Sequence, residues 1–387
     1  MTLRQKIEQE IRERGPIPFS RYMEMCLYDP ALGYYSRNAE QFGKAGDFYT
    51  SSDVHAVFGR LLARQFDEMW RALGSPERME ILEIGPGRGL FAQDVLDWSR
   101  KKFPAFFDAV HYSLAESSPA LRGRLQATLE QHFAAGKASL CSDGEAVLPS
   151  EAALERPLTA EVPIIVFGNE FFDALPVEVL SSQGELRISE KDGRLLESWQ
   201  PASAEALEFL DRYGVHPEAG ERIEASLIAQ RYMSQIAATI KRGFIIAIDY
   251  GYTRQEQLAG RHRGTIAAYR QHSMSANPYE APGEQDITAH VNFTALAAAA
   301  EGQGMQVQPL LTQSQFLLGI GEHNQFADAF EECRLPQEHA KVALQLKHLV
   351  TPEGMGESFQ VLVASKGISA ELVSKLSGLT FGKTTRP

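Results

Sequence analysis

The order of short apolar segments along the chain constrains its fold most strongly. From about residue 79, aliphatic runs alternate with stretches that have the spacing of amphipathic helices. Strands connected through helices pair in parallel, and such a sheet is covered on both faces. We therefore predict an open, doubly wound, mostly parallel α/β sheet. Its expected strands are "MEILEIG", "AVHYSLAES", "KASLCSD", "PIIVFGNE" and "GFIIAIDYG", and "MQVQPLLT" and "SFQVLVASK" could close the sheet.

The 387 residues divide into a sheet domain, an insert and two terminal segments. The segment "VEVLSSQGELRISEKDGRLLESW" alternates in polarity and contains two turn signals, which predicts an inserted antiparallel meander. The polar, turn-rich stretch 252–291 is long enough to be a lid-like excursion. The expected organisation is a helical N-terminal extension (1–75), two parts of the sheet domain (76–176 and 241–370), an inserted subdomain (177–240) and a tail (371–387).

Charge and composition exclude several classes of function. Acidic residues exceed Lys and Arg by 50 − 38 = 12, which disfavours nucleic acid and anionic membranes as partners. No apolar run reaches the roughly 20 residues that a membrane helix needs. Cys26, Cys141 and Cys333 are too far apart for a metal site or a disulfide framework. Because the first residues contain acids, unlike a mitochondrial presequence, we expect a cytoplasmic protein.

The motif "LEIGPGRGL" follows the first predicted strand and points to a ligand site. Gly85, Gly87 and Gly89 allow a sharp turn, close approach of a ligand and tight packing of the next helix. The spacing is G-x-G-x-G, and the carboxylate of Glu83 would repel a pyrophosphate at the helix N-terminus. A ligand that carries an ammonium and a sulfonium suits this acid, so we predict S-adenosylmethionine as the cofactor.

Further residues are expected to contact this cofactor. Glu116 follows the second predicted strand, where an acid can bind the ribose hydroxyls. Asp143 follows the third strand, where the adenine amino group could be read. In the glycine-rich loop "GDFYTSSD", Asp47, Thr50 and Ser51 could reach over the cofactor from the N-terminal part. The alternatives are a plain turn at Asp143 and an ordinary capped loop before a helix.

A second acidic motif, "VFGNEFFDALP", follows the fourth predicted strand. Asn169 and Glu170 stand at its carboxyl end, which is the ligand edge of an open parallel sheet. If a helical turn forms there, Asp173 shares one face with Glu170. Two acids and an amide could orient a guanidinium and draw off its proton, so we assign these three residues to catalysis. The alternative is a helix cap with a solvated glutamate.

The acceptor side is predicted to include residues from later in the chain. Tyr250 ends the fifth predicted strand at the same edge of the sheet. Asp286 and His290 lie in "APGEQDITAHVNF", where ordinary capping and a structural histidine are the alternatives. We place all three in a substrate pocket. No spacing resembles a metal site, so no metal is expected.

Together these motifs resemble the MidA family of S-adenosylmethionine-dependent methyltransferases. The resemblance runs from "GPIPFSRYMEMCLYDPALGYY" to "GESFQVLVASKG" and includes "LEIGPGRGLFAQDVL", "GNEFFDALPVEVL" and "DITAHVNF". It implies a class I methyltransferase, Rossmann-like fold with a helical N-terminal extension. It also implies protein arginine methylation, as in mitochondrial relatives that assemble respiratory complex I. The family's cofactor loop maps onto Glu83 and the three glycines, and its acids map onto Glu170 and Asp173.

Three functions are compatible with the sequence. The first is a methyltransferase that acts on a protein arginine, with a respiratory complex subunit among the candidate substrates. The second is a non-catalytic assembly or chaperone factor that keeps the cofactor as a ligand, although such a module has no need of the second acidic motif. The third, a nicotinamide dehydrogenase, is disfavoured by the glycine spacing and Glu83. The acceptor, the number of methyl groups and the oligomeric state stay open, with a homodimer possible.

Overall fold

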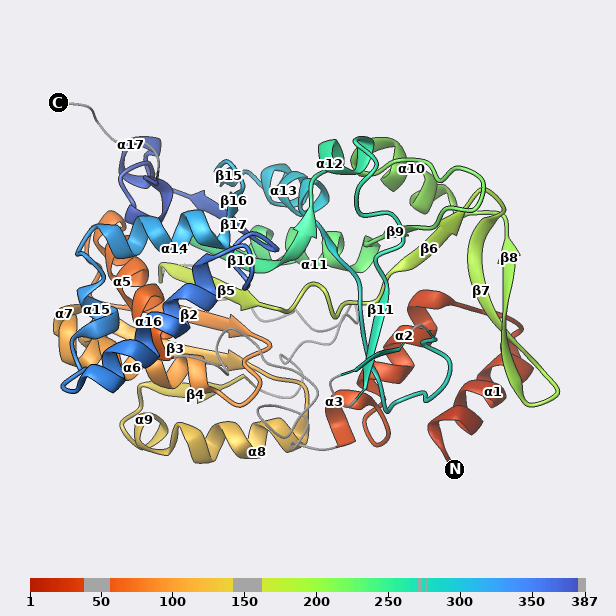
Figure 1. The fold of residues 1–387 in the computed structure, drawn as a ribbon, viewed down its shortest axis with the longest axis horizontal. Helices are drawn as coiled ribbons and strands as arrows, with labels where there is room; N and C mark the ends of the chain where they lie inside the picture. The colour runs from red at the N-terminus through yellow and green to blue at the C-terminus, as the bar shows by residue number, and fades with distance from the viewer. Residues whose placement is uncertain (38–55, 142–161, 271–272, 276, 382–387) are drawn as a thin grey trace.

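A nine-stranded, mostly parallel sheet forms the centre of the protein. The computed structural model describes residues 1–37, 56–141, 162–270, 273–275 and 277–381. Neighbouring strands from β10 to β4 pair in parallel, whereas β17 pairs antiparallel with β10, which confirms the predicted fold class (Figure 1). The order is β15 (Gln306–Val307), β17 (Phe359–Lys366), β10 (Gly243–Tyr252), β5 (Ile164–Asn169), β2 (Met79–Ile84), β3 (Val110–Ala115) and β4 (Ala138–Leu140), with β14 (Val291–Asn292) beside β10 and β16 (Leu311–Thr312) beside β17.

The strand order reverses at β2. The chain runs outward from β2 through β3 to β4, and then crosses back to β5 on the other side of β2. In open α/β sheets, ligands bind at the carboxyl ends of the strands where the order reverses. The segments that follow β2 and β5 are the two motifs singled out in the sequence, so the fold places both motifs at this edge.

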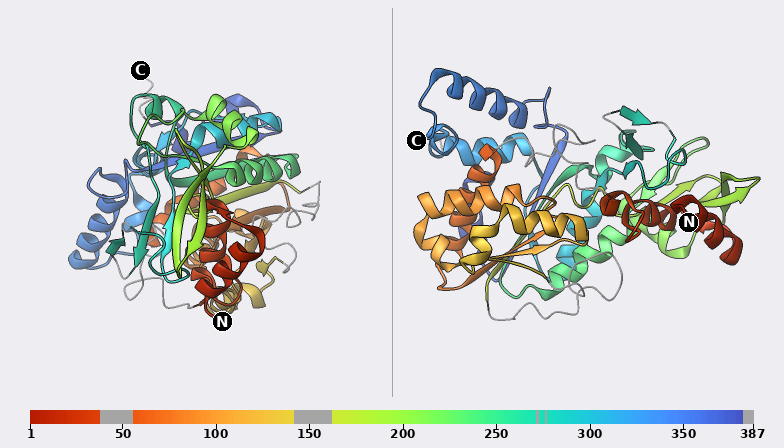
Figure 2. Two further views of the ribbon diagram at one scale, coloured as in Figure 1. Left: turned by 90° about the vertical axis from the view of Figure 1, so that its right-hand side faces the viewer. Right: turned by 90° about the horizontal axis from the view of Figure 1, so that it is seen from below.

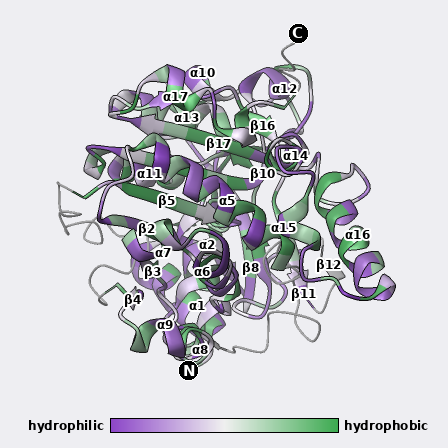
Figure 3. Ribbon diagram, turned by 90° about the vertical axis from the view of Figure 1, so that its left-hand side faces the viewer, coloured by the Kyte–Doolittle hydropathy of each residue, from purple (hydrophilic) through white to green (hydrophobic). Residues whose placement is uncertain are grey.

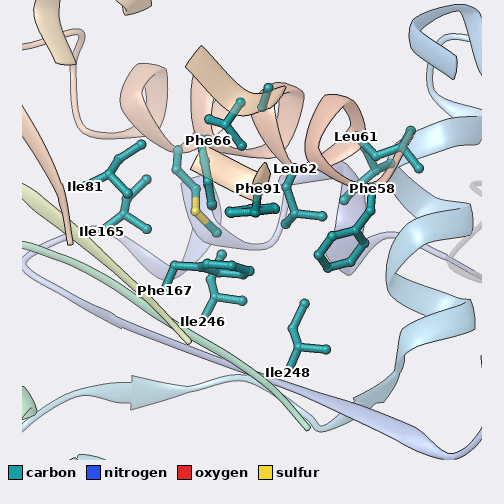
Figure 4. Close-up of a cluster of buried hydrophobic side chains, with 14 of the residues drawn as sticks. Phe58, Leu61, Leu62, Phe66, Ile81, Phe91, Ile165, Phe167, Ile246 and Ile248 are labelled. Carbon is teal, nitrogen blue, oxygen red and sulfur yellow. The ribbon is translucent and has the colours of Figure 1, made fainter. Parts of the chain in front are cut away.

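Helices cover both faces of the central sheet. Successive residues of a strand point to opposite faces, so Ile81 lies in one core and Leu82 in the other. In the first core, Phe58, Phe91 and Phe167 meet between helices and sheet (Figure 4), and the rings of Phe91 and Phe167 stack 4.4 Å apart. This core lies under α5 (Ala56–Ala72), α6 (Leu90–Lys102), α7 (Pro104–Ala109) and α14 (Gln313–Glu322), and the other under α11 (Leu227–Thr239) and α13 (Phe293–Gly302).

A second lobe combines the N-terminus, the insert and the 252–291 excursion. Its core contains Ile7, Ile188 and Ile287, one from each of these segments. Figure 2 shows the lobe at one end of the molecule, beside the central sheet. It consists of α1 (Leu3–Arg14), α2 (Phe19–Tyr28), an antiparallel sheet of β1 (Ile17–Pro18), β7 (Gly184–Lys191), β6 (Glu178–Ser181), β9 (Ile223–Ala225) and β8 (Arg194–Gln200), and a sheet of β12 (Ser273–Ser275), β11 (Ala267–Arg270) and β13 (Asp286–Thr288).

Packing divides the chain differently from the predicted boundaries. The range 1–75 does not form one extension, because α1 and α2 pack in the second lobe while α5 packs on the central sheet. The excursion expected to be a lid packs against the N-terminal helices, where the Tyr22 hydroxyl donates to the Pro278 carbonyl at 2.7 Å. The expected tail is anchored up to residue 381, because Val373 and Leu379 are buried in the main core.

The remaining elements complete the outer layers. Figure 3 shows β5 and β10 as hydrophobic strands inside the molecule, with hydrophilic residues on the surrounding helices. Within the described part of the chain, no helix has both the length and the apolar character needed to cross a membrane. These elements are α3 (Tyr34–Arg37), α8 (Pro119–Thr128), α9 (Glu130–Ala134), α10 (Ala204–Tyr213), α12 (Arg254–Leu258), α15 (Ala327–Phe330), α16 (Pro336–Val350), α17 (Ala370–Val373) and the 3₁₀ helix η2 (Ser377–Leu379).

Candidate active site

The glycine loop forms a tight left-handed turn between β2 and α6. Gly85, Gly87 and Gly89 have φ values of 66°, 55° and 77°, in the region that side chains rarely adopt. A Cβ on Gly85 would lie 2.9 Å from the Phe171 ring, and one on Gly89 would lie 2.5 Å from Leu125. The turn therefore favours glycine at all three positions for its backbone conformation, and at Gly85 and Gly89 also for close packing.

Two buried carboxylates flank this turn. Glu83 is 4% exposed and accepts a hydrogen bond of 2.8 Å from the Tyr112 hydroxyl. Burial raises its pKa to about 8, and the nearby charge of Glu116 adds to this rise. Glu116 accepts from the Ser118 amide at 2.8 Å, and burial raises its pKa to about 7. A positive ligand would stabilise both carboxylates, whereas a phosphate beside them would be repelled.

This chemistry fits S-adenosylmethionine. The ligand's ammonium would bind to carboxylates, and its ribose hydroxyls would donate hydrogen bonds to a carboxylate. Glu83, Glu116 and the glycine turn are the described residues that would hold the cofactor. The other residues predicted to contact it, Asp47, Thr50, Ser51 and Asp143, lie outside the described residues.

The segment after β5 wraps around a buried carboxylate instead of forming a helix. Asp249 at the end of β10 is fully buried, and its Oδ2 accepts from the amides of Phe171, Phe172 and Asp173 at 3.2, 2.9 and 3.2 Å. Its Oδ1 accepts from the Tyr250 amide at 2.9 Å. The helical turn that would have placed Glu170 and Asp173 on one face therefore does not form, because these amides donate to a side chain and not to carbonyls one turn earlier.

Glu170 is held in a strained position at the end of β5. Its φ of 51° is unusual for a residue with a side chain, and such strain is concentrated at functional sites. The Tyr250 hydroxyl donates to Oε2 and the Asn169 amide donates to Oε1, both at 3.0 Å. Since Asn169 uses its nitrogen here, its Oδ1 is an acceptor, and no donor among the described residues reaches it.

Four carboxylates meet next to this position, and we call Glu170, Asp173, Asp249 and Asp286 the acid cluster. Asp173 and Asp286 are each 5% exposed, and Asp286 accepts from the Tyr35 hydroxyl at 2.9 Å. Burial raises the pKa of Asp173 well above its usual value, and the other three carboxylates raise it further. Within the described chain, the buried Asp173 Oδ1 has no hydrogen-bond partner.

The predicted substrate-pocket residues lie in two different environments. The Tyr250 hydroxyl contacts Glu170 of the acid cluster, and Asp286 is itself a member of the cluster. His290 lies farther away, with its ring centroid 6.4 Å from that of Tyr250 and its Nδ1 3.0 Å from His262 Nδ1. Burial lowers the His290 pKa to about 4, with a further contribution from His262, so His290 is neutral at pH 7.

Some functional positions were not assigned from sequence. Asp249 ends the fifth predicted strand, but its support of the turn depends on contacts between two strands that the sequence does not reveal. Tyr35 and Tyr112 were missed, although "LGYYS" is a noticeable tyrosine-rich stretch. Among the described residues, no group of three or more His, Cys, Asp and Glu side chains could hold a metal ion.

Known proteins share this sequence and architecture. Residues 61–311 match a family model described as "Putative S-adenosyl-L-methionine-dependent methyltransferase". A Drosophila melanogaster protein named "Protein arginine methyltransferase NDUFAF7 homolog, mitochondrial" is 29% identical, over 97% of this chain and 87% of its own length. The Homo sapiens protein named "Protein arginine methyltransferase NDUFAF7, mitochondrial" is 26% identical, over 90% of this chain and 80% of its own.

A solved structure adds a ligand to this comparison. The crystal structure of a Burkholderia thailandensis protein bound to S-adenosyl-homocysteine superposes with a TM-score of 0.79 at 28% identity. The match covers 96% of this chain and 94% of that protein. The family model covers well over half of the chain, and the fold and the carboxylate-flanked glycine turn agree with it. The chain therefore belongs to this family of S-adenosylmethionine-dependent methyltransferases, which confirms the resemblance seen in the sequence.

Proposed function

We propose that this methyltransferase transfers methyl groups to arginine side chains of a protein. The observation that carries the proposal is the acid cluster, in which Asp173 and Asp249 have no cationic partner among the described residues. Asn169 Oδ1 and Asp173 Oδ1, which have no hydrogen-bond partner among the described residues, are both acceptors. A guanidinium supplies a positive charge and five N–H donors, so it fits this set of acceptors. The names of the curated relatives support the same acceptor.

The residues of the acid cluster would have different roles toward a guanidinium acceptor. Bound cofactor supplies an electrophilic methyl group. A guanidinium nitrogen becomes a nucleophile as it loses a proton, and the Glu170 carboxylate is positioned by Tyr250 and Asn169 to accept it. Asp173 and Asp286 would bind the other guanidinium nitrogens. Asp249 acts indirectly, because it fixes the turn that carries Glu170 and Asp173.

Methyl transfer to protein tests the proposal. Total protein from cells that lack this enzyme is incubated with labelled S-adenosylmethionine and the full-length protein. Wild type should label discrete protein bands, and Asp173→Asn should lose most of the label while retaining S-adenosylhomocysteine binding. Asp67→Asn is the matched control, because Asp67 is also buried but lies on α5. Absence of label with wild type, despite bound cofactor, would contradict the proposal.

The non-catalytic alternative makes a different prediction for the same variant. If the protein serves a respiratory complex only as a cofactor-binding assembly factor, Asp173→Asn should restore the function of cells that lack the protein. We propose that the substrate is a subunit of such a complex, which mass spectrometry of the labelled band would identify. We also propose a reducing compartment, the cytoplasm, because the three cysteines lie far apart in the sequence. Fractionation of cells would test this location.

A further inference from the structure

The short helix α3 connects the cofactor edge with the acid cluster. Tyr35 on this helix uses both its backbone and its side chain. Its carbonyl accepts from the Ser118 hydroxyl at 2.7 Å, and its own hydroxyl donates to Asp286 Oδ1 at 2.9 Å. The first contact joins residues that are 83 positions apart in the sequence, and the second joins residues that are 251 positions apart. Tyr35, which packs against the core of the second lobe, thus contacts both sides of the site.

At the cofactor end, the connection leads directly to Glu116. The Ser118 amide donates to the Glu116 carboxylate at 2.8 Å, and the Ser118 side chain caps α8 by accepting from Leu121 at 3.3 Å. Ser118 is almost fully buried, so its hydroxyl has little access to water. The Tyr35 carbonyl is therefore fixed by the same residue that orients the carboxylate predicted to bind the ribose.

At the acceptor end, the connection reaches the buried carboxylates. The Ala289 amide donates to the Asp173 carbonyl at 3.0 Å, so the segment that carries Asp286 lies beside Asp173, and the Asp286 charge raises the pKa of Asp173. The Tyr35 ring packs 5.5 Å from the Tyr28 ring, and the Tyr28 hydroxyl donates to the Ala174 carbonyl at 2.9 Å. Tyr35 is thus held in place beside the segment that carries Asp173.

We infer that Tyr35 is a positioning residue that fixes Asp286 for a cationic acceptor and connects it to the cofactor edge. This inference rests on the proposed function, because it requires an acceptor that binds carboxylates. Tyr35 itself need not touch the acceptor. Without the Tyr35 hydroxyl, the Asp286 carboxylate would be repelled by Asp173 and would turn away from it toward water. The acceptor would then bind more weakly, whereas the glycine turn and Glu83 would still bind the cofactor.

Tyr35→Phe tests this role by removing only the hydroxyl. The matched control is Tyr279→Phe, because the Tyr279 hydroxyl also donates to a carboxylate, Glu197, at 2.9 Å and lies in the same lobe. With cell protein as acceptor and labelled cofactor, Tyr35→Phe should raise the half-saturating acceptor concentration about tenfold. The rate at saturation should change much less, and calorimetry should give an affinity for S-adenosylhomocysteine within about twofold of wild type. Tyr279→Phe should change none of these quantities.

A second variant tests the connection from its other end. Ser118→Ala removes the bond to the Tyr35 carbonyl and a helix cap, whereas Ser203→Ala removes only a helix cap, on α10. If both fold, Ser118→Ala should raise the half-saturating acceptor concentration about threefold and Ser203→Ala should not. Acceptor affinities of Tyr35→Phe equal to those of Tyr279→Phe would overturn the inference and leave the methyltransferase proposal standing. Wild-type enzyme that binds S-adenosylhomocysteine but labels no protein would overturn both.

Discussion

The cofactor edge and the acid cluster both place carboxylates at the ends of parallel strands, but they are assembled differently. Glu116 is bonded by an amide two residues away, and Glu83 by a tyrosine on the adjacent strand. In contrast, the acid cluster collects residues from 170 to 286, and Asp286 is held from residue 35. The cofactor edge is thus built mainly from one continuous segment, from β2 through α6 to the end of β3, whereas the acceptor side requires the second lobe to be in place.

The largest expected effect separates chemistry from cofactor binding. Glu170→Gln keeps the shape of the side chain but removes the proton acceptor, so kcat should fall about 100-fold. The affinity for S-adenosylhomocysteine should be unchanged in calorimetry. Glu80→Gln is the control, because Glu80 lies near the start of β2, where it accepts from the Ser113 hydroxyl at 2.6 Å. Equal kcat values for the two variants would remove Glu170 from the mechanism.

The local character of the cofactor edge can be tested with Glu83. Glu83→Gln removes a charge-assisted contact to a cationic ligand, so the affinity for S-adenosylmethionine should fall about tenfold. Acceptor affinity at saturating cofactor should stay within error of wild type, since the acid cluster is built from other elements. A similar loss of cofactor affinity and of acceptor affinity would show that the cofactor edge and the acid cluster do not act independently.

A glycine pair tests the backbone of the turn. Gly89→Ala introduces a Cβ at a φ of 77° and next to Leu125, so it should lower the free energy of unfolding by about 1–2 kcal/mol. Gly123 lies within α8 with open space around a Cβ, so Gly123→Ala should raise that free energy by about 0.5–1 kcal/mol. Urea denaturation measures both. Effects of the same sign would contradict the described geometry.

The smallest expected effect concerns pH. In the free protein the pKa values of Glu83 and Glu116 are raised to about 8 and about 7, so both bind protons near neutrality. A cationic ligand favours the carboxylate form, so S-adenosylmethionine binding should release protons and tighten as pH rises from 6 to 8. Calorimetry in buffers of different ionisation enthalpy measures this release. Proton uptake on binding would contradict the expected ionisation of Glu83 and Glu116.

The same raised pKa values predict how stability depends on pH without ligand. Protons bind more tightly to these carboxyls in the folded state, so their contribution to stability is fully present below pH 4.5 and is lost as pH rises through 7 to 8. Glu83→Gln should therefore lose less stability than wild type between pH 6 and 9. Urea denaturation at several pH values would reveal equal losses if Glu83 were ionised throughout.

The contrast between the two regions also explains what the sequence could predict. The strands, the glycine turn, Glu83 and Glu116 follow from periodicity and local spacing, and the structure places them as expected. The support that Asp249 gives to residues 171–173, and the contact between Tyr35 and Asp286, arise only when distant segments pack. The helical turn considered at 170–173 does not form for this reason, since a tertiary contact satisfies the amides that a helix would have used.

Identification of the methylated amino acid tests the central claim most directly. Protein labelled by the wild-type enzyme is hydrolysed completely and its methylated amino acids are separated by chromatography. If the acid cluster binds a guanidinium, the label should elute with methylated arginines and should disappear with Asp173→Asn but not with Asp67→Asn. Label found in methyl-lysine, in carboxyl esters or in no amino acid would contradict the account.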